Sequence, residues 1–359
     1  MPLQFHSIAA QAAQALRTEI THRAWEEDLP GERQLAERFQ VSRKTIRKAL
    51  AELRAEGVLA TIRSRGSTIQ PRRRKARGVS QRIALLLPQP LEASRPYTAL
   101  WVNRLMGLLQ ETGHPLQIFY GVKFFGQNAA RSLARLTTTN SARCWIVGGS
   151  NRPLQEWFAA AGLPAIIAGS AHPGVRLPSV DVDHRALCRH SASLFLRHGH
   201  RQLALFLEHG GHAGDAESEQ GFRDGVSAAP DAAEPLVCSP LRSAPSIIRE
   251  VKRLLVRKER PTGWLVSNSY AYLTVLSYLA SVGLRVPRDI SVLSRDEETF
   301  LQFMHPTPTC YSTKPARFAH ALNQGLKRIL AGDTSPFALR IMPDLVPGNS
   351  VAAPGARAV

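Results

Sequence analysis

Arginine and lysine side chains recur at helical spacing in the segment 42–56. Its basic face carries Arg43, Lys44, Arg47, Lys48 and Arg54. The opposite face, at positions i, i+3, i+4 and i+7, is apolar and carries Ile46, Ala49, Leu50 and Leu53. This pattern predicts a helix that packs against a core and exposes its cations. Because such cations bind phosphate oxygens, and a guanidinium can also bind the edge of guanine, the segment is predicted to bind duplex DNA.

Ser42 and Gly57 are the residues predicted to begin and end this helix. The Ser42 hydroxyl can accept a hydrogen bond from a free amide of the first turn, and a glycine commonly follows the last turn. A shorter helix is predicted over 32–39, with Gln40-Val41 as the tight connection. An alanine-rich amphipathic pattern over 5–23 predicts the first helix of the same small domain.

Residues 58–62 and 67–70 are predicted to form a β-hairpin around Arg63-Ser64-Arg65-Gly66. The glycine would serve the turn, and the arginines suit the minor groove, where phosphates focus negative potential. Two helices, a tight turn and a basic hairpin in this order predict a winged helix-turn-helix, whose second helix enters the major groove. The alternative is a helical hairpin whose charged face is only solvated.

The segment 29–69 resembles the DNA-binding domain of GntR-type bacterial transcription regulators. Two motifs carry the likeness, Leu-Pro-Gly-Glu-Arg-Gln-Leu-Ala from Leu29 and Val-Ser-Arg-Lys-Thr-Ile-Arg-Lys-Ala-Leu from Val41, followed by a glycine-containing wing. The chain departs from the family at Gly31, where serine is common, but glycine is an acceptable N-cap. The resemblance and the basic hairpin together imply these DNA-binding residues: Arg33, Ser42, Arg43, Lys44, Thr45, Arg47, Arg65 and Gly66.

Composition agrees with a nucleic-acid-binding protein of more than one domain. The chain has 359 residues and a formal net charge of +18, which favours nucleic acid over acidic small substrates as the main partner. Its four cysteines form no C-x-x-C pair, so a disulfide scaffold or zinc site is not expected. The N-terminus lacks the pattern of an export signal, and no apolar run reaches about 18 residues. These features predict a cytoplasmic protein without a membrane segment.

Beyond residue 82 the sequence alternates short apolar runs with amphipathic segments, which is typical of parallel βαβ units. Strands are predicted over 83–87, 116–119, 144–147, 165–168, 203–207, 264–267 and 290–293, and helices over 100–111, 186–197, 247–256 and 272–282. The domain organisation expected is a winged helix-turn-helix over 1–70, a basic linker over 71–80, an α/β effector-sensing and dimerisation domain over 81–351 and a tail over 352–359. The linker can add phosphate contacts or act only as a solvated tether.

The longer part resembles the sensor domain of LacI-type repressors and periplasmic sugar-binding proteins. The likeness rests on residues 178–184 with 199–204, on Gly221-Phe222-Arg223, on 260–268 and on 283–292. It implies two α/β lobes joined by crossing strands, a ligand cleft between them and a dimer formed side by side. The whole chain therefore resembles sugar-responsive regulators in which a GntR-type reader is fused to this periplasmic-binding-protein-like sensor.

Candidate effector-binding residues follow the predicted strands, where ligands bind in open α/β sheets. Asn268 and Asp296 match ligand-binding positions of the family, whereas Ser218 and Ser269 replace its usual arginine and aspartate. Losing those two partners predicts weak hexose binding or a different ligand. Arg295, Tyr97, Gln89 and Trp101 could compensate, although a core aromatic or a surface arginine is the alternative reading of each. The effector site is thus predicted to comprise Asn268, Asp296, Tyr97, Ser218 and Arg295.

The sequence predicts a homodimeric, sequence-specific regulator, in particular a repressor, that binds a pseudo-palindromic operator and a small, carbohydrate-like effector. No catalytic motif or cofactor site is expected. No metal site is expected either, since His198, His200, His209 and His212 lack a fixed ligand spacing. Two alternatives stay open. The sensor could be a degenerate dimerisation scaffold, or the chain could be a small-molecule-binding module whose N-terminal helices serve protein interaction.

Overall fold

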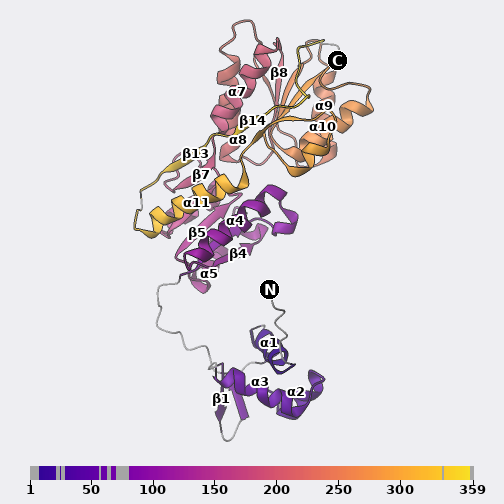
Figure 1. The fold of residues 1–359 in the computed structure, drawn as a ribbon. Coiled ribbons are helices and arrows are strands. Elements are labelled where there is room, and N and C mark those ends of the chain that lie inside the picture. Colours follow the sequence, from indigo (N-terminus) through magenta and orange to yellow (C-terminus); the bar gives the residue numbers. More distant parts are fainter. Residues whose placement is uncertain are drawn as a thin grey trace. The chain divides into compact units, whose positions relative to one another are not determined.

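The computed structural model describes residues 8–21, 25, 29–55, 58–62, 66–69, 81–333 and 335–355. The chain forms two compact units, Met1–Gly78 and Val79–Val359. Figure 1 draws both as ribbons, with the smaller unit in the indigo of the N-terminal residues. No helix in the described ranges is both long enough and apolar enough to cross a membrane.

The smaller unit contains three helices and a two-stranded sheet. They are α1 (Ile8–Thr21), α2 (Glu32–Arg38), α3 (Arg43–Ala55), β1 (Leu59–Ile62) and β2 (Gly66–Ile69), with β1 and β2 antiparallel. The apolar stripe predicted for α3 is buried together with Leu16 of α1 and Leu35 of α2. Burial of this stripe fixes the opposite, basic face of α3 toward solvent. The order of helices, turn and hairpin is that of the predicted winged helix-turn-helix.

The connections of this unit differ from expectation at one point. Gly66 pairs with Ile62 as the first residue of β2, so the prediction that it belongs to the turn is wrong. Gln40, between α2 and α3, takes a left-handed φ of 52°, and the next amide, of Val41, donates to the carbonyl of Ala36 at 3.1 Å. Arg65, Gly57 and the predicted linker 71–80 lie outside the described residues, as do the last four residues of the tail.

The larger unit is built on two six-stranded sheets. The first sheet comprises β3 (Ile83–Leu87), β4 (Leu116–Tyr120), β5 (Cys144–Gly148), β6 (Ala165–Ala168), β7 (Ser179–Val182) and β13 (Ala338–Ile341). The second comprises β8 (Leu203–Phe206), β9 (Leu236–Cys238), β10 (Gly263–Val266), β11 (Ser291–Ser294), β12 (Thr309–Ser312) and β14 (Asp344–Val346). All pairings are parallel except that of β12 with β14.

Helices cover both faces of each sheet, which is why the central strands are apolar throughout. In the first lobe, α4 (Pro96–Glu111) and α11 (Pro315–Leu330) cover one face, and α5 (Ala130–Thr139) and α6 (Arg152–Ala160) cover the other. In the second lobe, α9 (Ala244–Leu255) and α10 (Ser269–Ser281) cover one face, and α7 (His184–Arg197) and α8 (Ala213–Val226) cover the other. Short 3-10 helices lie at Leu91–Ala93, Val122–Phe124 and Thr299–Phe303.

The chain crosses between the lobes three times. It passes from β7 to α7, from β12 back to α11, and from β13 to β14 (Figure 1). These crossings confirm the two-lobed α/β fold. All seven strands and all four helices predicted in this unit are present, although several bounds shift by a few residues. The prediction omitted β7, β9, β12 to β14, α5, α6 and α11.

Helices α7 and α8 are in unusually close contact through two glycines. A Cβ atom added at Gly221 would lie 2.1 Å from the Arg185 carbonyl oxygen, and one added at Gly225 would lie 2.7 Å from Cβ of Ala192. Both distances are far below an ordinary contact, so only glycine permits this separation of the helices. The contact fixes where α8 presents Asp215, Glu217 and Ser218.

Candidate nucleic-acid interface and ligand cavity

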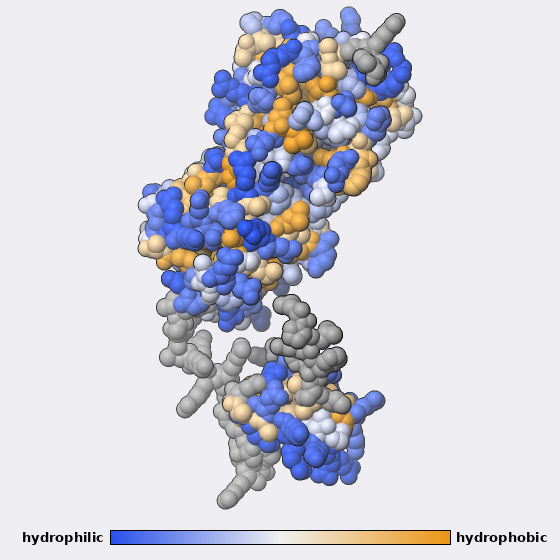
Figure 2. All heavy atoms as spheres, in the orientation of Figure 1, coloured by the Kyte–Doolittle hydropathy of each residue, from blue (hydrophilic) through white to orange (hydrophobic). Residues whose placement is uncertain are grey.

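Ser42 caps α3. Its hydroxyl oxygen accepts a hydrogen bond from the Thr45 amide at 3.1 Å, and the Ser42 and Thr45 hydroxyl oxygens are 2.8 Å apart. One of the free amides at the start of the helix is thereby satisfied, as the sequence predicts. These two predicted DNA contacts therefore also have a structural role. On the face drawn in Figure 2, the described surface of the small unit is mainly hydrophilic.

The cations on α3 fall into two groups. The Arg47 guanidinium lies 3.0 Å from the Glu32 carboxylate at the start of α2, and its hydrogen bond holds the pKa of Glu32 below the usual range. By contrast, Arg43, Lys44 and Lys48 are exposed and form no ion pair with any residue that the structure describes. The start of α3 thus presents cations that need not give up a partner to bind phosphate. Arg33 is exposed and lies 3.5 Å from Glu37.

A cavity of about 360 Å³, here called the main cavity, lies between the lobes of the larger unit. Its walls include residues that follow β3, β6, β8, β10 and β11, so it lies at the carboxyl ends of strands from both sheets. The predicted residues that line it are Gln89, Tyr97, Trp101, Asn268, Arg295 and Asp296. Ser218 and Ser269 do not line it, and both are fully buried.

Arg295 contacts Ser218, the residue that replaces the arginine usual in the resembled family. Its guanidinium donates to the Ser218 hydroxyl at 2.8 Å and to the Asp215 carboxylate at 2.9 Å. The Arg295 side chain is only 12% exposed, which rules out the surface-arginine alternative. An arginine from the end of β11 thus reaches α8, and Ser218 acts by holding that arginine.

Asp296 pairs with Arg95, a residue that the sequence prediction missed. Arg95 precedes α4 in the first lobe, and its guanidinium hydrogen-bonds to the Asp296 carboxylate in the second. Burial opposes ionisation of Asp296, but Arg95 and Arg295 outweigh burial and hold the pKa of Asp296 below its usual range. The carboxylate is therefore charged at neutral pH. No local signal marks Arg95, because its partner Asp296 lies 201 residues away along the chain.

Asn268 is largely committed to structure. Its side-chain oxygen accepts from the amides of Tyr270 and Ala271 at 2.9 and 3.3 Å, which caps α10. Its amide nitrogen donates to Glu208 at 2.9 Å. Because an asparagine amide carries two hydrogens, one N–H can still serve a ligand.

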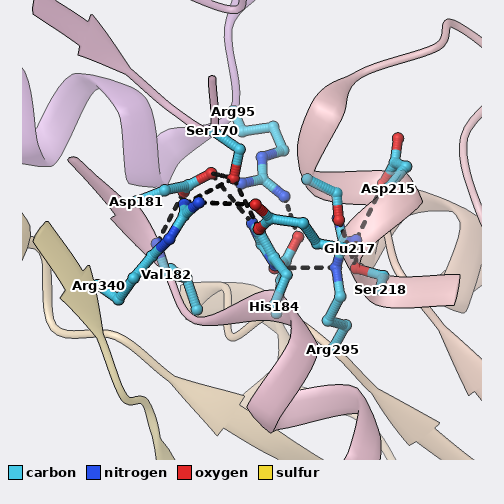
Figure 3. Close-up of polar contacts among 12 residues, drawn as sticks. Arg95, Ser170, Asp181, Val182, His184, Asp215, Glu217, Ser218, Arg295 and Arg340 are labelled. Atoms are coloured by element: carbon cyan, nitrogen blue, oxygen red, sulfur yellow. Dashed lines mark hydrogen bonds and ion pairs between the residues drawn. The ribbon is translucent and has the colours of Figure 1, made fainter. Parts of the chain in front are cut away.

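A second polar group, also missed from the sequence, joins the lobes beside the cavity (Figure 3). Arg340 of β13 donates to Glu217 of α8 at 2.6 Å and to the Ser170 hydroxyl at 2.9 Å. The Ser170 hydroxyl lies 2.8 Å from Asp181 and 3.0 Å from Glu217, so it can donate to either carboxylate. His184 lies 3.4 Å from Asp181. No local motif marks these residues, because they come from four separate chain segments.

The charges lining the main cavity are unbalanced. Three arginines, Arg95, Arg242 and Arg295, face five carboxylates, Asp181, Glu208, Asp215, Asp296 and Glu297. The chain as a whole carries +18, so this excess of carboxylates is a local feature. Aromatic rings complete the wall, with Trp101 and Phe318 packed at 5.3 Å between ring centroids. Such a site favours hydrogen-bond donors and apolar ring faces and disfavours an anion.

Two of the four histidines considered as metal ligands, His198 and His200, bind other groups. The His198 ring nitrogen lies 2.9 Å from the Leu194 carbonyl oxygen, and the two His200 ring nitrogens are within 2.9 Å of Thr262 and of the Ala352 carbonyl oxygen. Within the described ranges, no group of three or more histidine, cysteine, aspartate or glutamate residues is arranged to hold a metal ion.

Both parts of the chain match known families. Residues 8–69 match the bacterial regulatory proteins of the gntR family, and residues 192–351 match the periplasmic binding protein-like domain. The first match covers the helices and hairpin of the smaller unit. The second covers most of the second lobe together with α11 and the strands that return through both lobes. The two matches confirm the predicted combination of a DNA-binding and a sensor domain.

Individual proteins give the same picture. The chain is 24% identical over 289 residues to the arabinose metabolism transcriptional repressor of Geobacillus stearothermophilus, a match that covers 77% of each protein. The structure of a transcriptional regulator CelR–cellobiose complex is similar with a TM-score of 0.67 and 20% identity, over 87% of this chain and 92% of that one. A LacI transcriptional regulator from Bacillus cereus subsp. cytotoxis also gives a TM-score of 0.67, with 16% identity, over 76% and 98%. At such identities the structural likeness establishes the fold.

Proposed function

We propose that this chain is a cytoplasmic homodimeric repressor controlled by a small uncharged polyhydroxyl ligand in the main cavity. The chain is a DNA-binding transcription regulator that joins a GntR-type reader to a LacI-type, periplasmic-binding-protein-like sensor. The observation that carries the ligand class is the excess of carboxylates over arginines in that cavity, beside aromatic rings. Carboxylates accept hydrogen bonds from hydroxyls, whereas a phosphate or a uronate would meet a net negative wall.

The similar proteins support a carbohydrate. One is named as a repressor of arabinose metabolism, and the structure of another holds cellobiose. A ring with one apolar face and several hydroxyls fits a cavity lined both by Tyr97, Trp101 and Phe318 and by charged groups. Asp296 and Arg295 would orient the hydroxyls.

A dimer on a pseudo-palindrome follows from the size of the reader. One winged helix-turn-helix reads a single short half-site, so two copies related by a two-fold axis are needed for a specific operator. Light scattering on the full chain should give twice the mass of 39.4 kDa, and footprinting should reveal two related half-sites. A monomer at micromolar concentration with an unrepeated footprint would contradict the dimer.

A second candidate function has its own support. Arg95 pairs with Asp296 between the lobes, and Arg295 pairs with Asp215 within the second lobe, so charged groups lining the cavity satisfy one another as a ligand otherwise would. The sensor could therefore be a dimerisation scaffold that needs no effector.

Thermal unfolding in the presence of sugars distinguishes an effector-controlled sensor from a dimerisation scaffold that binds no effector. A ligand that binds only the folded state stabilises it by about 2.7 kcal/mol at a concentration of 100 Kd. We expect neutral mono- or disaccharides to raise the melting temperature of the full chain and to weaken its binding to operator DNA, and glucose 6-phosphate to do neither. A chain that binds its operator tightly but responds to no neutral sugar would favour the scaffold.

A further inference from the structure

Another cavity, here called the apolar pocket, has a volume of about 130 Å³. The described residues that line it all belong to the second lobe. They lie in the loops that follow β8, β9 and β10 and at the starts of α9 and α10. In open α/β sheets, ligands bind at this carboxyl end of the strands. The apolar pocket thus has the position of a binding site within a single lobe.

The lining of the apolar pocket differs from that of the main cavity. Two large apolar side chains on its rim are exposed, Leu241 at 57% and Tyr270 at 42%. Among the described residues, the only charged side chains that line it are Glu208 and Arg242, which lie 3.4 Å apart and neutralise each other. Cavities of this kind bind apolar ligand groups. Its buried apolar lining residues are Phe206, Leu207, Pro240 and Ile247.

Four polar residues lie between the apolar pocket and the main cavity, because they line both. The Glu208 carboxylate accepts a hydrogen bond from Asn268 at 2.9 Å and pairs with Arg242 on its other oxygen. The polar groups of this boundary therefore largely satisfy one another. A sugar in the apolar pocket would leave most of its hydroxyls unpaired, so the two cavities suit different ligands. The four shared residues are Glu208, Arg242, Ser267 and Asn268.

The rim of the apolar pocket is held in place without a ligand. The Leu241 amide donates to the Ser246 hydroxyl at 3.0 Å, and the Ser243 amide donates to the Leu241 carbonyl oxygen at 2.7 Å. These bonds tie the loop after β9 to the first turn of α9. The Tyr270 ring stacks on Phe300, with 5.7 Å between ring centroids. Because the rim is already ordered, a ligand does not lose affinity by ordering it.

We infer that the apolar pocket is a second ligand site, distinct from the main cavity, and that it takes one uncharged aromatic ring with at most one small polar group. The size agrees, because an apolar cavity of about 150 Å³ can hold benzene. Phe206 and Tyr270 offer ring contacts that favour an aromatic ligand over an aliphatic one of the same size. A charged ring would lose its hydration, since both charges of the lining are already paired. This inference goes beyond the proposed function and holds whether or not the main cavity binds a sugar.

Ligand-detected NMR titration of the full chain tests the site, with benzyl alcohol as the probe. We expect saturable binding with a dissociation constant of about 1 mM or lower, which is reasonable for eight non-hydrogen atoms. Cyclohexylmethanol has nearly the same size and the same hydroxyl but no aromatic ring, and benzoate keeps the ring but is charged. Each of these two should bind at least about fivefold more weakly than benzyl alcohol.

Two variants locate the probe. Ala244→Trp would fill the pocket from the start of α9, and Leu241→Ala would remove apolar surface from its rim; both positions are exposed, so the fold should tolerate the changes. We expect Ala244→Trp to abolish binding of benzyl alcohol and Leu241→Ala to weaken it at least about threefold. Ala134→Trp on α5 and Val256→Ala at the end of α9 make similar changes at exposed positions outside the pocket, and both should bind the probe as wild type does.

The outcomes separate the site from its ligand class. Absence of saturable binding to wild type, or binding that survives Ala244→Trp, would overturn the site. Benzoate or cyclohexylmethanol that binds as tightly as benzyl alcohol would overturn the uncharged aromatic class. The sugar titrations test the carbohydrate effector separately, so failure of the apolar pocket would leave the proposed function standing.

Discussion

The Glu298 carboxylate accepts a hydrogen bond from the main-chain N–H of Tyr97 at 3.2 Å. Tyr97 lies in the first turn of α4 in the first lobe, and Glu298 follows β11 in the second. Arg95, at the N-cap position of α4, forms no side-chain capping bond, so a carboxylate from the other lobe satisfies this amide instead. Separation of the lobes would leave the amide without its acceptor. The start of α4 is thus coupled to lobe closure.

Arg43 and Lys48 of α3, which form no ion pair with the residues that the structure describes, lead to a prediction about DNA affinity. Arg43→Ala should cost about 1 to 3 kcal/mol of operator binding if the guanidinium contacts guanine, whereas Lys48→Ala should weaken all sequences alike and reduce the salt dependence. Fluorescence anisotropy measures both. Arg131→Ala, which removes an exposed cation from α5 of the sensor, is the control for net charge.

Arg47 should respond differently, because Glu32 holds it at 3.0 Å. Glu32→Gln removes a negative charge beside the basic face and releases Arg47 for a phosphate. We expect this variant to bind DNA more tightly than wild type and with a steeper salt dependence. Weaker binding would mean that Glu32 positions Arg47 for its contact.

Asp296→Asn should separate ligand response from DNA binding. A ligand shifts the DNA-binding equilibrium only by its different affinity for two states, so loss of its anchor removes the shift. The roughly 5- to 150-fold change expected on adding effector to wild type should disappear, while operator affinity without effector stays the same. An unchanged response in this variant would place the site elsewhere.

The Arg295–Asp215 pair predicts a stability effect. Both side chains are 12% exposed, so removal of one leaves the other charge poorly solvated. Arg295→Ala should lower the unfolding free energy by about 3 to 5 kcal/mol, and the double variant with Asp215→Ala by less than the sum of the single losses. Urea denaturation of wild type, the two single variants and the double variant gives the double-mutant cycle. Additive losses would show that the pair does not interact.

His200 predicts how stability depends on pH. It is 1% exposed, with one ring nitrogen 2.8 Å from the Thr262 hydroxyl and the other 2.9 Å from the Ala352 carbonyl oxygen, and burial lowers its pKa to about 4. Between pH 6.5 and 4 the unfolded chain then binds a proton that the folded chain excludes. Stability is therefore full above pH 6.5 and should fall by about 3 kcal/mol at most as the pH drops to 4. In His200→Asn this part of the pH dependence should vanish.

The sequence predicted those features that depend on local pattern. The apolar stripe of α3 and the Ser42 cap are set by residues within one helix, and the strands 83–87 and 165–168 were found with their observed bounds because every residue in them is apolar. Strands such as β13 and β14 were missed because they are short, lie at sheet edges and are half exposed, so their sequences carry no continuous apolar run.

The candidate cavity was predicted only in part for a related reason. Asn268 and Asp296 follow central strands and could be found from their position. Arg95 and Arg340 could not, because the partners that give them meaning lie 201 and 123 residues away along the chain. Ser218 likewise hydrogen-bonds to Arg295, which lies 77 residues away along the chain, so its role could not be predicted from the local sequence.

Two glycines of α8 that contact α7 set the position of α8, although neither glycine lines the cavity. Glycine is needed there because α7 leaves no room for a methyl group at Gly221 or Gly225. A single added carbon would push α8 away from α7, and Asp215, Glu217 and Ser218 would move with the helix. The ligand preference of the sensor is therefore adjustable from a surface that no ligand touches, and a change of effector during evolution need not begin in the binding site.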